Sequence, residues 1–174
     1  GKKGSKRNDL SVSGWNYQAL KAAKLSGLNI PNLHKAIDKC VKYLESTQTK
    51  DGGFGSANRE GGYNQWNLTG VSTLGLQTLG LGKSAAINKG IRWASDFHHK
   101  EPPIWSNVNL YAWYYYAQTY FQVGGPELKY WNETALPEIL KNQAKDGSWT
   151  GAGATAGGDK IFATTLCTLM LEVY

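Results

Sequence analysis

Two segments of this 174-residue chain match each other in residue type and spacing: QTKDGGF at residues 48–54 and QAKDGSW at residues 143–149. In each, a glutamine precedes a Lys-Asp-Gly triplet, and an aromatic residue follows two positions after the first glycine. The segments lie 95 residues apart, so a unit of about 47 residues would place one more copy between them. A degenerate copy stands there, in Lys89–Trp93 followed by Pro102–Trp105. The chain is therefore predicted to be built from repeats.

Hydrophobic periodicity predicts seven helices of two alternating kinds. They span residues 11–26, 32–47, 67–81, 84–97, 107–123, 128–143 and 160–174. The second, fourth and sixth are amphipathic, as expected of outer helices with one face in water. The third and fifth contain no charged residue, the first only Lys21 and Lys24, and the seventh is apolar almost throughout. These four are predicted to be inner helices packed on all sides. The pattern indicates an all-α fold in which outer helices wrap an inner ring.

Length and charge indicate one domain behind a basic tail. The chain is long enough to bury a core of its own. Four of its positive charges fall within the first seven residues, and the net charge is +6. We therefore expect a flexible basic tail at residues 1–9 and one repeat domain at residues 10–174. Because the charge is concentrated in the tail, no nucleic-acid partner is expected. No segment is both long enough and apolar enough to span a membrane.

The repeated motif carries a family resemblance. Preceded by Tyr43-Leu44 or Ile139-Leu140, it resembles the QW repeat of squalene–hopene and oxidosqualene cyclases, and it is similar to the repeats of protein prenyltransferase β-subunits. With Ser13-Gly14-Trp15, it looks particularly like squalene-cyclase-like repeat proteins found in large bacterial polypeptides. The resemblance covers nearly the whole chain after residue ten. It implies an α/α toroid, here a partial one of about seven helices in three and a half α-hairpins.

The motif also has a physical interpretation of its own. A glutamine at the end of an outer helix, such as Gln48 or Gln143, can bond exposed backbone groups at helix termini. The aromatic residue after the glycine turn, Phe54 or Trp149, can cover the adjacent helix end. We therefore expect these residues to stiffen the hairpins and not to perform chemistry.

The catalytic motifs of the resembled enzymes are missing from the sequence. The cyclases imply an Asp-x-Asp-Asp acid motif, and none occurs. The prenyltransferases imply a zinc ion held by Asp, Cys and His. Asp38-Lys39-Cys40 imitates part of that set but shares an outer helix with His34, so we interpret it as coincidence and expect no metal. His98 and His99 are interpreted as residues that cap a helix C-terminus. The thioester motif of related complement-type toroids and the P-loop are also missing, and no cofactor is expected.

The resemblance places ligands at the wide mouth of the ring, near the N-terminal ends of the inner helices. In this chain it implies ligand contacts from Trp15, Tyr63, Trp66, Trp105 and the start of the fifth helix. Asp159 falls in the same region. It is either the N-cap of the last helix or an acid at the mouth of a groove, and it is the one weak catalytic candidate.

The most distinctive stretch is the aromatic run YAWYYY that begins at Tyr111. At helical spacing, Trp113, Tyr116 and Tyr120 form one stripe, and Tyr111 forms a second stripe with Tyr115. Two interpretations stay open. The stripes either pack in the core or form an aromatic platform for isoprenoid chains, sugar faces or peptide side chains.

An incomplete ring would leave its inner helices lining an open groove, to be covered by a partner, a second copy in a homodimer, or further chain. The leading hypothesis is a binding domain for an apolar, glycan or peptide ligand in that aromatic groove. The alternative is an isoprenoid- or terpenoid-processing enzyme in which this chain forms part of a cavity. A purely architectural repeat is the third. Whether the chain is an enzyme stays open, although a classical terpenoid cyclase or protein prenyltransferase is not expected. Localisation is open too, with export as part of a larger bacterial protein as one alternative.

Overall fold

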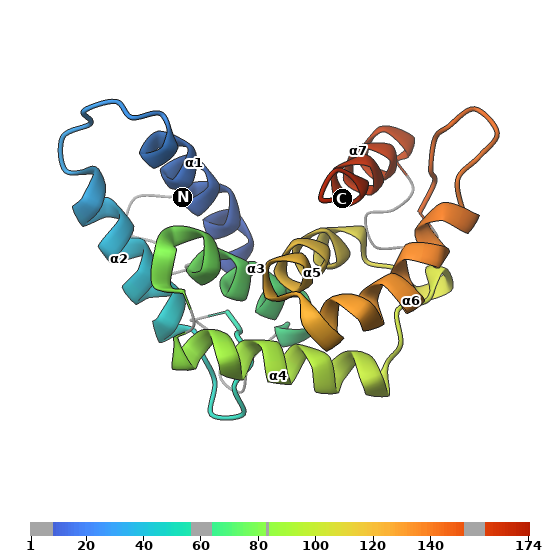
Figure 1. Ribbon diagram of the computed structural model, residues 1–174, viewed down its shortest axis with the longest axis horizontal. Helices are drawn as coiled ribbons and strands as arrows, with labels where there is room; N and C mark the ends of the chain where they lie inside the picture. The colour runs from blue at the N-terminus through green and yellow to red at the C-terminus, as the bar shows by residue number, and fades with distance from the viewer. Residues whose placement is uncertain (1–8, 57–63, 83, 152–158) are drawn as a thin grey trace. The chain divides into compact units, whose positions relative to one another are not determined.

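The computed structural model describes residues 9–56, 64–82, 84–151 and 159–174 (Figure 1). These residues contain seven α-helices and no β-strand, so the predicted all-α class is confirmed. Each predicted helix has an observed counterpart. The helices are α1 (Leu10–Leu25), α2 (Leu33–Ser46), α3 (Gln65–Leu76), α4 (Ala85–Lys100), α5 (Leu110–Val123), α6 (Gly125–Lys141) and α7 (Lys160–Leu171).

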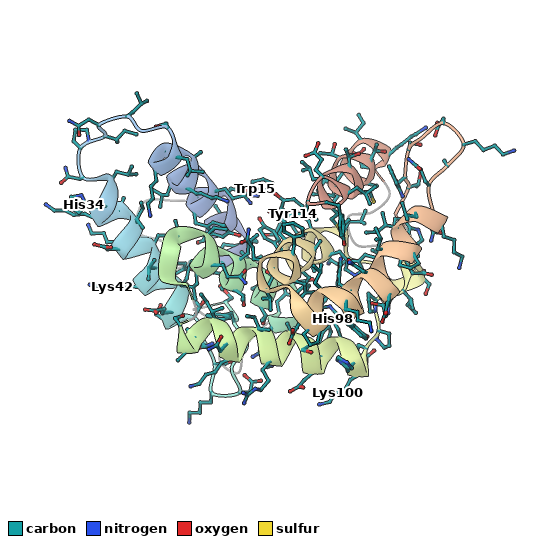
Figure 2. All side chains as sticks on the ribbon, viewed as in Figure 1. Trp15, His34, Lys42, His98, Lys100 and Tyr114 are labelled. Carbon is teal, nitrogen blue, oxygen red and sulfur yellow. The ribbon has the colours of Figure 1, made fainter. Side chains whose placement is uncertain are left out.

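The chain divides into two compact units, residues 1–94 and 95–174, with the boundary inside α4. In the first unit, α1 packs against α2 and α3, and α2 packs against α3. Every residue from Leu68 to Leu76 is buried, as predicted for an uncharged inner helix. The predicted helix 67–81 is nevertheless divided, because a π-helical turn at Gln77–Leu81 contains Gly80 at φ 101°. The amphipathic α2 buries Leu44 and directs Lys42 away from α1 (Figure 2).

In the second unit, α5 packs against both α6 and α7. Residues 112–117 of α5 are all buried, which agrees with the prediction for the second uncharged helix. The amphipathic α6 buries Trp131, Ala135 and Ile139, which are spaced four residues apart and so lie on one face. The core of this unit is therefore formed largely by aromatic side chains of α5 and α6.

The prediction that the first and seventh helices are packed on all sides is wrong. On α7 the buried residues Ala163, Leu166 and Met170 occupy one face, while Ile161 is 78% exposed. On α1 the chain buries Leu10, Gly14 and Tyr17 and leaves the opposite face in water. The physical reason is that a helix without charges is not necessarily surrounded. Uncharged polar residues and single apolar side chains are common on protein surfaces.

The helix bounds repeat with the same 95-residue spacing as the sequence motif. The bounds of α3 and α7 differ by 95 residues at both ends, and α2 and α6 end at Ser46 and Lys141, also 95 residues apart. The degenerate middle copy keeps the order but not the spacing: residues 89–93 lie in α4 and residues 102–105 follow it, but α4 ends at Lys100, 54 residues after α2 ends at Ser46. The two full copies of the motif are thus equivalent in structure as well as in sequence.

Candidate functional site

The two motif turns are held by matching hydrogen bonds. Gln48 Nε2 donates to the carbonyl oxygens of Gly52 (3.0 Å) and Ala86 (2.8 Å). Gln143 Nε2 donates to the carbonyl oxygen of Gly147 at 2.9 Å. Gly52 and Gly147 have φ angles of 98° and 84°, a region that favours glycine. The expected bond to a helix terminus is therefore present for Gln48, through Ala86 in the first turn of α4, whereas Gln143 bonds its own glycine turn.

The aromatic residues of the two motifs are also fixed alike. The amide of Phe54 donates to Thr69 Oγ1 at 3.0 Å, and the amide of Trp149 donates to Thr164 Oγ1 at 3.1 Å. Each threonine follows its aromatic partner by 15 residues. Both aromatic side chains are buried, which agrees with a structural role.

The aspartates of the two motifs have different partners. Asp146 accepts a hydrogen bond from Lys160 Nζ at 2.6 Å and two from Ser148. The Lys160 bond, followed by those from Ser148, holds the pKa of Asp146 well below its usual range. This turn therefore carries an exposed ion pair.

Asp51, at the equivalent position of the first motif, has neutral partners. It accepts from Thr49 Oγ1, from Gln65 Nε2 (2.9 Å) and from Trp93 Nε1 (3.0 Å). Burial raises the pKa of Asp51, but the hydrogen bonds from Thr49, Trp93 and Gln65 outweigh it and leave the pKa lowered. Gln65 stands 95 residues before Lys160, so it occupies in the first motif the position that Lys160 occupies in the second.

An open pocket of about 480 Å³ lies at this first turn. It is lined by Gln48, Thr49, Lys50, Asp51 and Gln65. Of these residues, Gln48 was predicted to be structural and Gln65 to lie in the expected ligand region near Tyr63, whereas a pocket at this turn was not predicted. The two motif copies have different residues at one equivalent position, Gln65 in the first and Lys160 in the second, and this difference is the signal in the sequence that distinguishes the two turns.

The aromatic residues expected at a ligand site fall into two groups. Trp15 on α1 and Trp66 on α3 are 55% and 42% exposed, and Trp15 projects from the side of α1 away from α2 (Figure 2). Both belong to the first unit. Tyr63 lies outside the described residues. In the second unit, Trp105 is buried and Tyr111 is half-buried.

The remaining expected ligand contacts, Trp113, Tyr116 and Tyr120, are buried in the second unit. Both predicted stripes are present: the rings of Tyr116 and Tyr120 stack 6.0 Å apart, and those of Tyr111 and Tyr115 meet edge-on at 4.9 Å. In this arrangement the three buried rings pack on neighbouring side chains of their own unit.

His98 lies at the centre of this aromatic cluster. It is 3% exposed, its ring meets that of Tyr116 edge-on at 4.5 Å, and its Nδ1 lies 2.8 Å from the Tyr120 hydroxyl. Burial raises the pKa of Tyr120 well above its usual range, so this hydroxyl stays protonated. The interpretation of His98 as a capping residue is therefore wrong. That interpretation suits His99 better, because its Nδ1 lies 2.7 Å from the Ser95 carbonyl oxygen.

Asp159 is the N-cap of α7, as one of its two interpretations predicted. Its Oδ1 accepts from the amides of Ile161 (2.8 Å) and Phe162 (3.4 Å). Replacing Asp159 by alanine is expected to lower the free energy of unfolding by about 0.5–2 kcal/mol. Asp159→Asn should retain most of that stability, since an amide oxygen also caps. Urea denaturation of both variants measures the difference, and equal losses would contradict a capping role.

The described residues hold no group of three or more His, Cys, Asp or Glu side chains that could bind a metal ion. The Asp38-Lys39-Cys40 segment lies on α2 with Asp38 exposed and Cys40 half-buried, and His34 is near the start of the same helix (Figure 2). Burial raises the pKa of the Cys40 thiol. Among the described helices, none combines the length and apolar character needed to cross a membrane.

Part of the chain is similar to a squalene–hopene cyclase from Zymomonas mobilis subsp. mobilis (strain ATCC 31821 / ZM4 / CP4). The two are 34% identical over 94 residues, and the match covers 49% of this chain but only 14% of the cyclase. No protein-family model matches the chain, and no solved structure matches it. The similarity supports a squalene-cyclase-like relationship.

Proposed function

We propose that this chain is a squalene-cyclase-like repeat domain that binds a ligand through exposed aromatic side chains, without classical cyclase or prenyltransferase chemistry. One observation carries the proposal: Trp15 and Trp66 remain 55% and 42% exposed on α1 and α3, two helices that pack together. Tryptophan combines a large apolar ring with an N–H donor, which makes it frequent at binding surfaces.

Among apolar, glycan and peptide ligands, an apolar ligand is favoured by the rest of this surface. Val12, Trp15, Ala19 and Ala22 are all exposed, and their spacing places them on one stripe of α1. Beyond the stripe, Leu25 is 74% exposed. Covering such side chains removes apolar area from water, at about 25 cal/mol per Å². The squalene named for the similar cyclase makes a linear isoprenoid the first candidate.

The proposal retains the expected partial α/α toroid. The equivalent bounds of α3 and α7 support a repeat architecture, and the exposed apolar side chains of α1 and α7 agree with a ring that a second copy or further chain completes.

Tryptophan-fluorescence titration with geranylgeraniol, chitotriose and an apolar peptide tests this function. Geranylgeraniol is expected to produce a saturable change that disappears in the Trp15→Ala/Trp66→Ala double variant. Trp113→Phe is the matched control, because Trp113 is 5% exposed, and it should leave the titration intact. A flat response to all three probes, or a response that survives the double substitution, would rule out this surface.

The alternative is an isoprenoid-processing enzyme in which this chain forms part of a cavity, and the similarity to a squalene–hopene cyclase favours it. Incubation with squalene followed by mass spectrometry of the products tests it. Asp159→Asn should abolish any turnover if Asp159 is the acid, while keeping α7 capped. An absence of cyclised product from the wild-type chain would reject the enzyme.

A further inference from the structure

We propose that the pocket at the first motif turn binds a neutral, polyhydroxylated ligand of the carbohydrate class. The lining includes neither Trp15 nor Trp66, the two side chains of the tryptophan surface proposed above, and the inference does not depend on the function proposed for them. The chain builds the same turn twice: in one copy Lys160 forms an ion pair with Asp146, and in the other a pocket of about 480 Å³ lies beside Asp51.

The open turn offers hydrogen-bonding groups that are not used up by the protein. Asp51 accepts side-chain hydrogen bonds from Thr49, Gln65 and Trp93, and a backbone hydrogen bond from Gly53 also lowers its pKa, yet the residue stays exposed at the pocket. Gln48 and Gln65 donate through Nε2, and in the described part of the chain their amide oxygens accept no hydrogen bond. The pocket lining therefore includes two amide oxygens that no protein donor occupies, beside the exposed carboxylate of Asp51.

The charge of the lining selects the class of ligand. Lys50 and Asp51 both line the pocket, and no ion pair involves Lys50 among the described residues. The ammonium would repel a cationic ligand, and the carboxylate would repel an anionic one. A hydroxyl can donate to Asp51, and a neighbouring hydroxyl can accept from Lys50, so that both contacts are charge-assisted. Adjacent hydroxyls of a sugar satisfy this pair.

The site is also preorganised. The hydrogen bonds to Asp51 come from three segments of the first unit, including Trp93 on α4 at a distance of 42 residues in the chain. Gly53 lies against Gln65 and Trp93 so closely that a Cβ atom there would be 2.7 Å from Gln65 Nε2. A carboxylate fixed in this way loses little freedom when a ligand binds.

Chemical-shift mapping by ¹H–¹⁵N NMR with maltotriose, cellotriose and chitotriose tests the proposal. At least one sugar is expected to shift the amides of residues 48–53, the Gln65 side-chain amide and the Trp93 indole N–H. Gln65→Lys places an ammonium where Lys160 stands in the second turn and should close the pocket, with at least a tenfold loss of affinity. Lys50→Met, an exposed substitution that leaves the turn intact, should also weaken binding.

Two control variants separate this site from the rest of the chain. Asp146→Asn alters the equivalent carboxylate of the second motif turn, and Trp15→Ala alters the proposed apolar surface, so neither should change the sugar titration. An absence of shifts with all three sugars would overturn the proposal. So would sugar-induced shifts centred on Trp15 and Trp66, or binding of Nα-acetyl-lysine methyl ester at Asp51. None of these results bears on whether geranylgeraniol binds the tryptophan surface.

Discussion

Replacement of Trp131 by alanine is expected to lower the free energy of unfolding by about 3–5 kcal/mol. Trp131 is 1% exposed, and its ring centroid lies 5.6 Å from that of Tyr120 and 5.8 Å from those of His98 and Trp113. Truncation removes contacts with all three rings and leaves a cavity that these side chains cannot fill without leaving their own packing positions. Urea denaturation followed by far-UV circular dichroism measures the change.

Trp66→Ala is the matched control, because it makes the same chemical change at a tryptophan that is 42% exposed. Its cost should be near 1 kcal/mol, in proportion to the smaller apolar area that it buries. If Trp131→Ala costs no more than Trp66→Ala, the aromatic cluster is not a packed core. The platform interpretation of Trp113, Tyr116 and Tyr120 would then gain weight.

The helices could be predicted from the sequence because their signal is local. The absence of charge between residues 67 and 81 predicted the burial observed from Leu68 to Leu76, and the charged stripe of α2 predicted the outward position of Lys42. Such patterns can be interpreted without knowing which element packs against the helix, since charged side chains are rarely buried in any protein core. The same reasoning failed for α7, where Ile161 is exposed although its helix carries little charge.

The candidate sites depend on contacts between residues that are distant in sequence, and for this reason they could not be predicted in the same way. The burial of His98 depends on Tyr120, 22 residues further along, and its backbone carbonyl accepts from the Tyr130 hydroxyl, 32 residues further along. The environment of Asp51 depends on Trp93. Residue type alone indicated that His98 ends a helix, but not which side chains surround it.

The internal repeat supplies part of this missing information. Once the 95-residue register is known, Thr69 and Thr164 are equivalent positions, and each accepts the amide proton of its motif's aromatic residue. The same register shows that Gln65 replaces Lys160, so that Asp51 accepts from a neutral amide where Asp146 accepts from an ammonium group. Where two copies share a structure, the positions at which they differ are the first candidates for function.

Gly75→Val is expected to lower the free energy of unfolding by about 1–3 kcal/mol through overpacking. A Cβ atom at Gly75 would lie 2.7 Å from Leu44 Cδ1 and 2.8 Å from Tyr17 Cδ1. Both neighbours are 0% exposed, so neither can rotate into solvent, and α3 would have to move away from α1 and α2. Ala22→Val on the exposed face of α1 is the control and should cost less than about 1 kcal/mol, which reflects helix propensity alone. The same displacement would alter the position of α1, which carries Trp15, relative to α3. Gly75→Val should therefore also weaken the fluorescence response to geranylgeraniol, measured under conditions in which the variant is still folded. Unchanged stability in urea denaturation would mean that the three helices of the first unit do not pack closely at Gly75.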